Sequence, residues 1–405
     1  MNSTNISVVY YTHTYFLDAT IETLKSFKDK VDIHLLIELA PESKNSTILD
    51  IDSLDGFAAI ERVENVLDNK MFNLLKNYFS QLASVHFVIH TSKGGFSFSS
   101  FTIASKVGKW INTLNPDIIH FDTISSRTIG IYPYIRNKKI FITIHDPVAH
   151  SGEYSWKRRI PKFVYFSSTI GFFFYSSFAK SQFQIHYPNI DIPKHVLKLQ
   201  PYSFIKNFTT LNIKFKNNSF ILFFGRISYY KGIDILLASI PNILEKFPNE
   251  NFVIAGNFLQ YPIDNDFLEK YGSHITIINE YVSIDTLSDL IQSCKFVVCP
   301  YRDATQSGVL MTTMALGKST IASNVGSFPE YINDGVNGLL TEPTISSLTN
   351  TIIKALENNR YLDLERNLKS DYSFINSNYN QQKIISAYTR CDTKFNAINR
   401  LKRAK

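Results

Sequence analysis

The chain has 405 residues, of which 44% are hydrophobic and 19% are charged, and its formal net charge is +7. This composition excludes a disordered or fibrous protein and, at roughly 150 residues per domain, indicates two to three globular domains. The cysteines Cys294, Cys299 and Cys391 are too few and too scattered for a disulfide framework or a zinc site. The mild positive charge permits acidic small molecules, anionic lipid surfaces or nucleic acid and selects none of them.

The hydrophobic pattern predicts neither a secretory leader nor a membrane span. Residues 1–5 are polar and lead directly into an apolar run. The longest apolar stretch, residues 163–178, is interrupted by serine and threonine residues and does not reach the length needed to span a bilayer. We therefore expect a cytoplasmic protein.

In the first half of the chain, short apolar runs alternate with helical patterns. Strands are predicted at residues 6–11, 31–39, 87–90, 117–121 and 140–144, with helical stretches at residues 21–27 and 99–114. Buried strands that alternate with amphipathic helices are typical of a mostly parallel sheet with helices on both faces.

The same alternation restarts after residue 202. Strands are predicted at residues 219–224, 251–255, 275–278, 296–299, 319–322 and 338–340, and helices at residues 233–247, 284–293 and 305–316. We predict an α/β protein with doubly wound domains at residues 1–205 and 206–375, followed by a helix and basic tail (376–405) that cross back to the first domain. Because such sheets bind ligands at the carboxyl ends of their strands, we expect the site in a cleft between the domains.

Two cations lie in the loop that follows the strand predicted at residues 219–224. Gly225 permits a sharp turn, and Arg226 and Lys231 then project from the mouth of the sheet. This pair suits a diphosphate, since Arg can grip two oxygens while Lys adds a point charge. Charge on a leaving phosphate would be stabilised there without a metal. The alternative is a solvated turn with two ordinary surface cations.

Small polar residues precede the helix that ends near residue 316. Backbone N–H groups at Ser307 and Gly308 could hold a phosphate with help from the helix dipole. The alternative is an ordinary helix cap without a ligand. Gly94 and Gly95, which follow the strand at residues 87–90, make a similar case for close backbone approach from the first domain.

Two imidazoles and two carboxylates follow the strand at residues 140–144, namely His145, Asp146, His150 and Glu153. A histidine at a strand end can donate to a substrate hydroxyl or act as a base. These four groups could in principle hold a metal, but a proline and a glycine in the same stretch imply an irregular loop without metal-ligand spacing. His120, Asp117 and Asp122 at the preceding strand could cap it or line the cleft.

The remaining motifs are less specific. The carboxylate pairs Asp50/Asp52 and Asp264/Asp266 follow no buried strand and are predicted in surface loops. The chain has no dinucleotide-binding fingerprint, Walker loop or Gly-x-Ser-x-Gly elbow. The basic residues at 156–161, beside the aromatic stretch 163–178, could rest on an anionic membrane; the alternative is a helix with a solvated basic side and a buried aromatic side. Nucleic-acid binding would need a denser basic stripe.

Together these motifs resemble the retaining glycosyltransferases of family 4 (glycosyl transferases group 1), whose GT-B fold has two Rossmann-like domains facing across a cleft. The resemblance is strongest at residues 220–343 and looser elsewhere. The matching segments are Phe224-Gly-Arg-Ile, Tyr230-Lys-Gly-Ile-Asp234, Val253-Ile-Ala-Gly256, Val297-Val-Cys-Pro-Tyr301, Ala315-Leu-Gly-Lys318, Ile321-Ala-Ser-Asn-Val-Gly326, Pro329-Glu330, Gly335-x-Asn-Gly-Leu-Leu340, Gly94-Gly95 and His145-Asp146-Pro147. Their order and spacing are more specific than any one of them.

The resemblance implies a role for each candidate residue. The residues implied to bind the donor phosphates are Arg226, Lys231, Ser307, Gly308, Gly94 and Gly95. Those implied to contact the nucleobase or ribose are Tyr281, Val282 and Thr312, and those at the donor sugar are His145 and Gln306. Catalysis is assigned to His145, Arg226 and Lys231, and no metal or other cofactor is expected.

One feature departs from the family pattern. Its members commonly carry a Glu-x7-Glu pair, with the first Glu near the donor sugar and the second on the ribose, whereas Ala304 and Thr312 occupy these positions here. The change weakens donor-sugar recognition and the ribose contact. Thr312 still offers a hydroxyl, and Asp303 could replace the first carboxylate if the loop shifts.

The primary hypothesis is a metal-independent glycosyltransferase that moves a hexosyl or related group from a nucleotide diphosphate sugar to an acceptor hydroxyl with retention. The resemblance implies bacterial surface-polysaccharide assembly (capsule or lipopolysaccharide) on a glycan or lipid-linked acceptor, at the inner face of the membrane and without nucleic acid. A second hypothesis is a degenerate GT-B protein that binds a nucleotide or glycan without transfer. A third, a sugar-nucleotide epimerase, would need more acid–base groups in the cleft.

Overall fold

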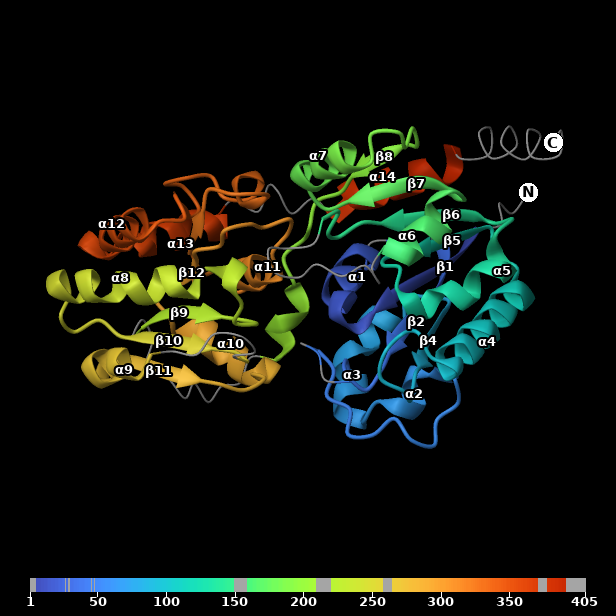
Figure 1. Cartoon of the computed structure of the whole chain (residues 1–405), viewed down its shortest axis with the longest axis horizontal. Helices are drawn as coiled ribbons and strands as arrows, with labels where there is room; N and C mark the ends of the chain where they lie inside the picture. The colour runs from blue at the N-terminus through green and yellow to red at the C-terminus, as the bar shows by residue number, and fades with distance from the viewer. Residues whose placement is uncertain are drawn as a thin grey trace.

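The structure, a computed structural model, describes residues 5–25, 27, 30–44, 46, 48–148, 159–208, 220–257, 264–370 and 377–390. These residues form two sheets, each covered by helices on both faces (Figure 1). The predicted α/β architecture with two doubly wound, mostly parallel sheets is confirmed. The boundaries proposed at residues 205 and 375 stay predictions.

The first sheet has eight strands in the order β3-β4-β2-β1-β5-β6-β7-β8. Only the pair β3 and β4 is antiparallel among the described strands of this sheet. The strands are β1 (Ile6–His13), β2 (Val31–Leu39), β3 (Ile60–Arg62), β4 (Ser84–Ile89), β5 (Ile118–Phe121), β6 (Lys139–Thr143), β7 (Thr169–Phe174) and β8 (Lys194–Val196).

Alternate side chains of the central strand β1 pack against helices on opposite faces of the sheet. Val8 and Tyr10 pack in a cluster with α1, α3 and α14, whereas Val9 and Tyr11 pack in a cluster with α4, α5, α6 and α7. This two-sided burial explains why the strands are continuously apolar. The helices are α1 (Leu17–Leu24), α2 (Val63–Val66), α3 (Asn69–Phe79), α4 (Phe98–Leu114), α5 (Tyr132–Ile135), α6 (Arg159–Phe166), α7 (Ser177–His186) and α14 (Ser377–Arg390).

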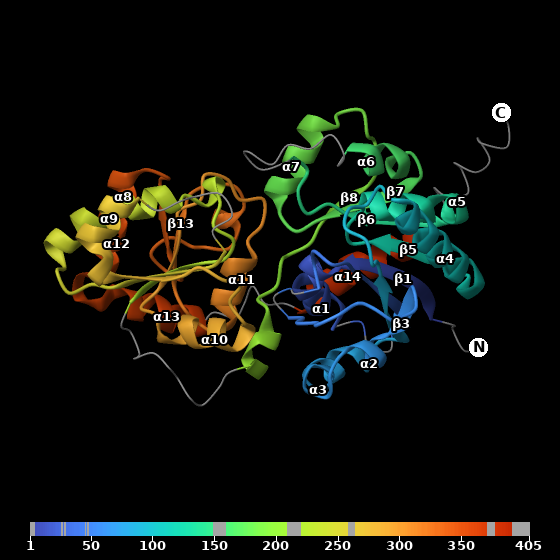
Figure 2. The ribbon, with the colours of Figure 1, turned by 60° about the horizontal axis from the view of Figure 1, so that its bottom comes forward.

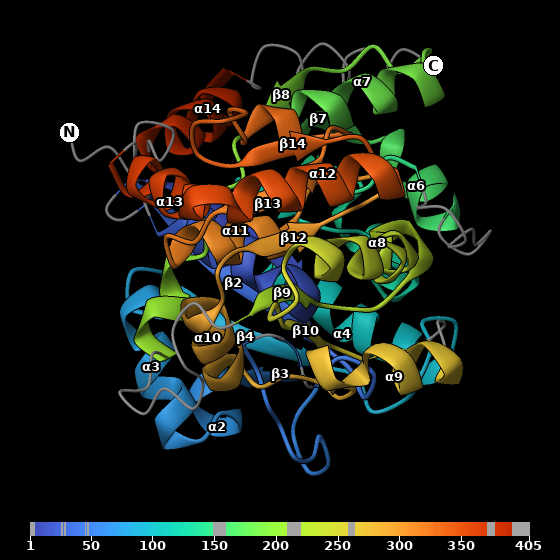
Figure 3. The ribbon, with the colours of Figure 1, turned by 90° about the vertical axis from the view of Figure 1, so that its left-hand side faces the viewer.

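The second sheet has six strands, all parallel, in the order β11-β10-β9-β12-β13-β14. Helices α8, α12 and α13 lie in front of its strands when the molecule is viewed from this domain (Figure 3), and α10 and α11 pack on the other face. The elements are β9 (Ile221–Phe224), α8 (Ile233–Lys246), β10 (Phe252–Ala255), α9 (Asn265–Tyr271), β11 (Ile275–Ile278), α10 (Ile284–Ser293), β12 (Val297–Cys299), α11 (Gly308–Ala315), β13 (Thr320–Ser323), β14 (Leu339–Thr341), α12 (Ile345–Leu356) and α13 (Arg360–Ser370).

The last described helix, α14, packs on the first sheet beside α1 (Figure 2). The Tyr388 hydroxyl lies 2.5 Å from His120 Nδ1 in the buried core. The Asn380 side chain accepts a 2.8 Å hydrogen bond from the Lys198 N–H and donates one of 2.7 Å to the Lys198 carbonyl. Helix α14 and the segments β1 and α1, which are far apart in the sequence, therefore share one core.

Direct hydrogen bonds join the two domains at the start of α7. The Glu330 carboxylate accepts the N–H groups of Ser177 and Phe178 at 2.9 and 2.8 Å. The neighbouring Tyr331 hydroxyl donates to the Tyr175 carbonyl at 2.6 Å and accepts the Leu199 N–H at 2.9 Å. A carboxylate at the positive end of a helix dipole is stabilising, so the second domain caps a helix of the first.

One predicted helix starts later than expected. The helix predicted at residues 305–316 begins at Gly308, because the Ser307 hydroxyl accepts the Leu310 N–H and acts as the N-cap. The stretch 163–178, for which a membrane-resting surface and a helix were the two alternatives, contains the end of α6, strand β7 and the start of α7. The aromatic side chains of β7 are fully buried in the sheet, whereas Phe163 on α6 is exposed.

Some sequence predictions lie outside the described residues: His150, Glu153, the basic residues Lys157 and Arg158, Cys391 and the tail 391–405. Among the helices that are described, none combines the length and apolarity needed to cross a bilayer.

Candidate functional site

The loop after β9 places the two predicted cations differently. Arg226 is exposed, whereas Lys231 is buried, with its ammonium group 5.4 Å from the centroid of the Tyr301 ring. Gly225 has φ +103°, and a Cβ atom there would lie 2.7 Å from Lys231 Nζ. The glycine therefore serves both the left-handed turn and the close approach of the lysine.

An ion pair fixes both ends of this loop. The Arg302 guanidinium makes two hydrogen bonds to the Asp234 carboxylate, of 2.8 and 2.5 Å, and lies 4.1 Å from the centroid of the Tyr229 ring. Burial favours the neutral acid, but the hydrogen bonds and charge of Arg302 lower the pKa of Asp234. Because Tyr229 and Asp234 flank Lys231 in sequence, this contact holds the segment that carries the buried lysine.

The charge of Arg226 acts on a residue of the first domain. Burial raises the pKa of the Tyr15 phenol, and the positive charges of Arg226 and Arg127 partly offset that rise. The Tyr15 hydroxyl itself donates to the Glu42 carbonyl at 2.5 Å. The charge of Arg226, at the carboxyl end of a strand in one sheet, is therefore felt by a residue that follows the first strand of the other.

Helix α11 starts at the same interface. Ser307 caps the helix with its hydroxyl, so the ordinary capping role considered for it is present. The first N–H groups of a helix have no acceptor within the helix and remain suited to an anion. A Cβ atom at Gly308 would lie 3.4 Å or more from the Tyr202 ring, which is ordinary contact.

His145 lies directly beyond β6 and is held from both domains. Its Nε2 is 3.2 Å from Oδ1 of the buried Asp122, and its Nδ1 is 2.6 Å from Nε2 of Gln306 in the second domain. The imidazole stacks on Phe16 with 3.8 Å between ring centroids. The structure therefore brings together the two residues that the sequence assigned to the donor sugar.

The charge of His145 is set by Asp122. Burial alone would lower the pKa of the imidazole, but the negative charges of Asp122, 3.2 Å away, and of Asp146 help to outweigh it and raise the pKa. Burial raises the pKa of Asp122, but the charges of His145 and His120 and the hydrogen bonds to the carboxylate together outweigh it and lower the pKa. Asp122 also accepts hydrogen bonds from Tyr10, Thr12 and Thr20, which fix the orientation of its carboxylate.

A second polar group in the first domain was not predicted. The Glu38 cluster consists of His13, Glu38, Glu42, His90 and Arg127. Oε1 of Glu38 lies 3.6 Å from Arg127 Nη1 and 3.7 Å from His13 Nε2, and Arg127 Nη2 lies 2.6 Å from Oε1 of Glu42. Burial lowers the pKa of His90 to about 4, so its imidazole is neutral at physiological pH.

Parts of the Glu38 cluster have unused hydrogen-bonding capacity. In the portion of the chain that is described, Oε1 of Glu38 and Nδ1 of His90 are buried without a hydrogen-bond partner. Buried polar groups are normally paired, so atoms of this kind are suited to a bound hydroxyl. The available sequence signal is a carboxylate within the apolar run 31–39 and histidines at two strand ends.

Gly94 and Gly95 lie beside the Glu38 cluster, where the Ser92 carbonyl accepts a hydrogen bond from Arg127. A Cβ atom at Gly95 would fall 1.7 Å from the Ser126 hydroxyl. This glycine is thus needed for contact within its own domain. Gly94 has φ +81°, and a Cβ atom added there would meet no heavy atom of the described residues within 4 Å, so its requirement is conformational.

The residues predicted at the nucleoside lie on α11 and on the loop before α10. Tyr281 is 52% exposed and Val282 is partly buried. The Thr312 hydroxyl donates to the Gly308 carbonyl at 2.8 Å within its own helix. Ala304, at the first position of the missing carboxylate pair, is buried.

The metal hypotheses gain no support from the described residues. Within them, no group of three or more His, Cys, Asp or Glu side chains is arranged to hold an ion. Asp264 is the N-cap of α9 and Asp266 lies in its first turn, both exposed, as expected for surface positions. Asp50 and Asp52 are also exposed.

Comparison with known proteins matches most of the second domain to a described family. Residues 218–358 match the family described as glycosyl transferases group 1. The resemblance to group 1 glycosyltransferases is confirmed. An uncharacterized glycosyltransferase of Methanocaldococcus jannaschii is 36% identical over 124 residues, which are 30% of this chain and 32% of the relative. The chain spans about a third of the length of the first curated relatives that it matches.

Solved structures extend the likeness to the whole fold. A glycosyltransferase from Rickettsia africae is similar with a TM-score of 0.62 and 15% identity, over 96% of this chain and 98% of that one. Anabaena HepE, solved in complex with UDP, is similar with a TM-score of 0.58 and 15% identity, over 97% and 100% of the two chains. These likenesses show the GT-B fold.

Proposed function

We propose that the protein is a glycosyltransferase that moves a sugar from a nucleotide diphosphate sugar to an acceptor hydroxyl with retention of configuration. The observation that carries this proposal is that one loop at the end of β9 holds the buried Lys231 and the exposed Arg226, whose charge acts on Tyr15 of the first domain. The match to glycosyl transferases group 1 and the UDP bound to HepE support it.

Arg226 and Lys231 would bind the donor diphosphate. A buried ammonium group interacts strongly with an anion because little water screens it, and the guanidinium can hold two phosphate oxygens. These charges would stabilise the nucleotide diphosphate as it leaves, together with the first amides of α11. This arrangement needs no metal ion, and we propose metal-independent transfer.

His145 would contact the donor sugar through Nδ1. Its Nε2 is committed to Asp122, whereas Nδ1 faces Gln306, which is also proposed at the sugar. With its pKa raised, the imidazole carries a proton on each nitrogen over a wider pH range. The Gln306 amide, whose nitrogen lies 2.6 Å from Nδ1, would then have to turn its oxygen to the ring, and a sugar oxygen could take the same proton in its place. Asp122 acts as a positioning residue for this ring.

The Glu38 cluster would bind the acceptor. Carboxylate, imidazole and guanidinium groups side by side can accept from and donate to several hydroxyls of a glycan. We propose a glycan or lipid-linked glycan acceptor in bacterial surface-polysaccharide biosynthesis, such as capsule or lipopolysaccharide. The proposed location is the cytoplasm or the inner face of the membrane.

A second candidate is a GT-B protein that binds nucleotide or glycan without transfer. It is favoured by the buried Ala304 and by the Thr312 hydroxyl, which already donates to Gly308. Neither position supplies the carboxylate usual in the family. This candidate predicts binding of a nucleotide diphosphate with no product from any donor.

The test is a thermal-shift screen with UDP, GDP, ADP and CMP and their sugar conjugates, with and without EDTA. A ligand that binds the folded state raises Tm by mass action. We expect one nucleotide diphosphate to do so regardless of EDTA. Arg226→Ala and Lys231→Met should each weaken its binding by about tenfold or more, because each removes a charged hydrogen bond. Lys354→Ala, an exposed control on α12, should not.

Transfer is then measured with the donor so identified, and NMR gives the anomeric configuration of the product. Undiminished turnover in the Arg226→Ala/Lys231→Ala variant would exclude the proposed mechanism. Binding that depends on these residues but yields no product with any acceptor would favour the binding-only candidate.

A further inference from the structure

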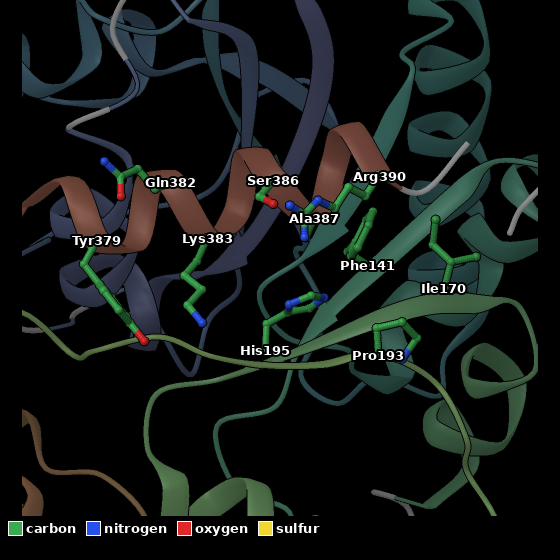
Figure 4. Close-up of a pocket in the computed structure, with 10 residues that line it drawn as sticks. All are labelled: Phe141, Ile170, Pro193, His195, Tyr379, Gln382, Lys383, Ser386, Ala387 and Arg390. Carbon is green, nitrogen blue, oxygen red and sulfur yellow. The ribbon is translucent and has the colours of Figure 1, made fainter. Parts of the chain in front are cut away.

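A cavity of about 580 Å³ lies between α14 and the strands β6, β7 and β8 (Figure 4). The Lys383 side chain extends from α14 towards the strand that carries His195, and the His195 ring extends towards the helix (Figure 4). The volume falls within the range of ordinary small-molecule sites. The transferase proposal makes no use of this cavity.

The cavity lies further from the carboxyl ends of the strands than the interdomain site does. Phe141 is the middle residue of β6, Ile170 is the second residue of β7, and Pro193 directly precedes β8. His145, in contrast, follows the carboxyl end of β6. Four residues along an extended strand separate Phe141 from His145 by about 13 Å. A ligand in this cavity would therefore not occupy the donor site.

The polar side of the cavity is positively charged. Lys383, Arg390 and His195 line it, and none of the described residues that line it is Asp or Glu. Burial lowers the pKa of His195, and the positive charges of Lys383 and Lys180 lower it further. The chain that continues beyond Arg390, residues 391–405, adds five basic side chains and one acidic one. This tail is therefore poorly suited to neutralise the cavity, whereas an anion is well suited.

The other side of the cavity is apolar. Phe141, Ile170, Pro193 and Ala387 form it, and the Tyr379 ring lies at one end. A small inorganic ion would leave this surface uncovered. An organic molecule with an apolar body would cover it and gain about 25 cal/mol for each Å² that it removes from water.

We propose that this cavity binds a small organic phosphate, with the phosphate held by Lys383 and Arg390 and the apolar body against Phe141 and Ile170. A phosphate monoester carries close to two negative charges at neutral pH, which matches the two flexible cations. Ser386 and Gln382 also line the cavity and offer hydrogen-bond donors. The same phosphate chemistry occurs in a soluble metabolite and in a lipid headgroup.

The test is isothermal titration calorimetry on the full chain with 1-naphthyl phosphate, inorganic phosphate and 1-naphthol. We expect 1-naphthyl phosphate to bind most tightly, because it alone has both the charge and the apolar body. Lys383→Ala/Arg390→Ala should weaken its binding by about tenfold or more, since two charged hydrogen bonds are removed. The exposed pair Lys109→Ala/Lys354→Ala is the matched control.

Two further variants locate the site. Ser386→Phe, at a partly buried position lining the cavity, should block binding by filling the space. Arg226→Ala/Lys231→Ala should leave it unchanged, which separates this proposal from the donor site. Binding that falls with the Arg226/Lys231 pair instead, equal binding of 1-naphthol, or no binding of 1-naphthyl phosphate would each overturn the proposal.

Vesicles of phosphatidylglycerol and phosphatidylcholine distinguish the two sources of the phosphate. Sedimentation with anionic vesicles that is lost in Lys383→Ala/Arg390→Ala would assign the site to a lipid headgroup. Calorimetric binding of 1-naphthyl phosphate without such sedimentation would assign it to a soluble ligand.

Discussion

Replacing Asp122 with Asn tests the electrostatics of the buried pair with His145. The Asp122 side chain is fully buried, 3.2 Å from His145 Nε2, and accepts hydrogen bonds of 3.2, 3.0 and 2.9 Å from Tyr10, Thr12 and Thr20. The amide keeps the shape of the carboxylate but loses its charge and one acceptor oxygen. The imidazolium is then buried without its main counter-charge, and only the weaker effect of Asp146 remains.

The expected loss in the free energy of unfolding depends on the protonation states of His145 and Asp122. Removing one partner of a buried ion pair typically destabilises a protein by about 3–5 kcal/mol. Because the pKa of His145 is raised in the folded state, its contribution to the free energy of unfolding is fully present below about pH 6.5 and is lost as the pH rises through the folded-state pKa. Because the pKa of Asp122 is lowered, its contribution to the free energy of unfolding is lost only as the pH falls through a folded-state pKa that lies below about 3.9. The full cost is therefore expected near pH 6, and about 1–3 kcal/mol at high pH, where only hydrogen bonds are lost.

The assay is guanidinium unfolding followed by tryptophan fluorescence at about pH 6 and about pH 9, on either side of the usual histidine pKa. Both tryptophans, Trp110 and Trp156, precede residue 205, so the signal reports on the first domain. Asp117→Asn is the control, because Asp117 is exposed and its carboxylate accepts a backbone N–H, that of Ser7. A loss in Asp122→Asn that is the same at both pH values would refute the charge-pair reasoning.

Two further substitutions test backbone geometry and the domain interface. Gly232→Ala would place a Cβ atom 1.9 Å from the Pro300 carbonyl oxygen, at a backbone φ of +68°. We therefore expect the free energy of unfolding to fall by about 3 kcal/mol or more, with a lower Tm. The control is Gly272→Ala, whose Cβ atom would meet no described atom within 4 Å and which should change the free energy of unfolding by about 1 kcal/mol or less. Glu330→Ala removes two hydrogen bonds to the start of α7 and should cost about 1–2 kcal/mol in chemical denaturation, against about 0.5 or less for the exposed control Glu342→Ala. A stable Gly232→Ala protein, or equal losses in the two glutamate variants, would contradict these contacts.

Most of the fold could be predicted because its strands are buried on both faces. The strands predicted at residues 31–39 and 275–278 coincide with β2 and β11. Strand β7 was missed because Phe172, Phe173 and Phe174 form a continuous aromatic run, which fits a buried helix as well as a buried strand. Strand β8 is short and lies at the sheet edge, where Lys194 and His195 give no apolar signal.

The candidate site could be predicted only where its residues are close in sequence. Arg226 and Lys231 were found because glycines at fixed offsets mark their loop. The Glu38 cluster depends on strand register: His13 of β1 and Glu38 of β2 are direct partners in the sheet, 25 positions apart in the chain. The contact of His145 with Gln306 depends on the relative placement of two domains, which no local pattern encodes.

The return of α14 to the first sheet has a consequence during synthesis. The core around Phe141 is completed by Tyr388, so the first domain cannot bury this surface until nearly the whole chain has left the ribosome. At about 5–20 residues per second, the 169 positions from Phe208 to Ser377 take roughly 10–30 s. For that interval an apolar face of the first sheet is open to chaperones and to other nascent chains. Burial of this face of the first sheet thus waits for α14, the last of the described helices.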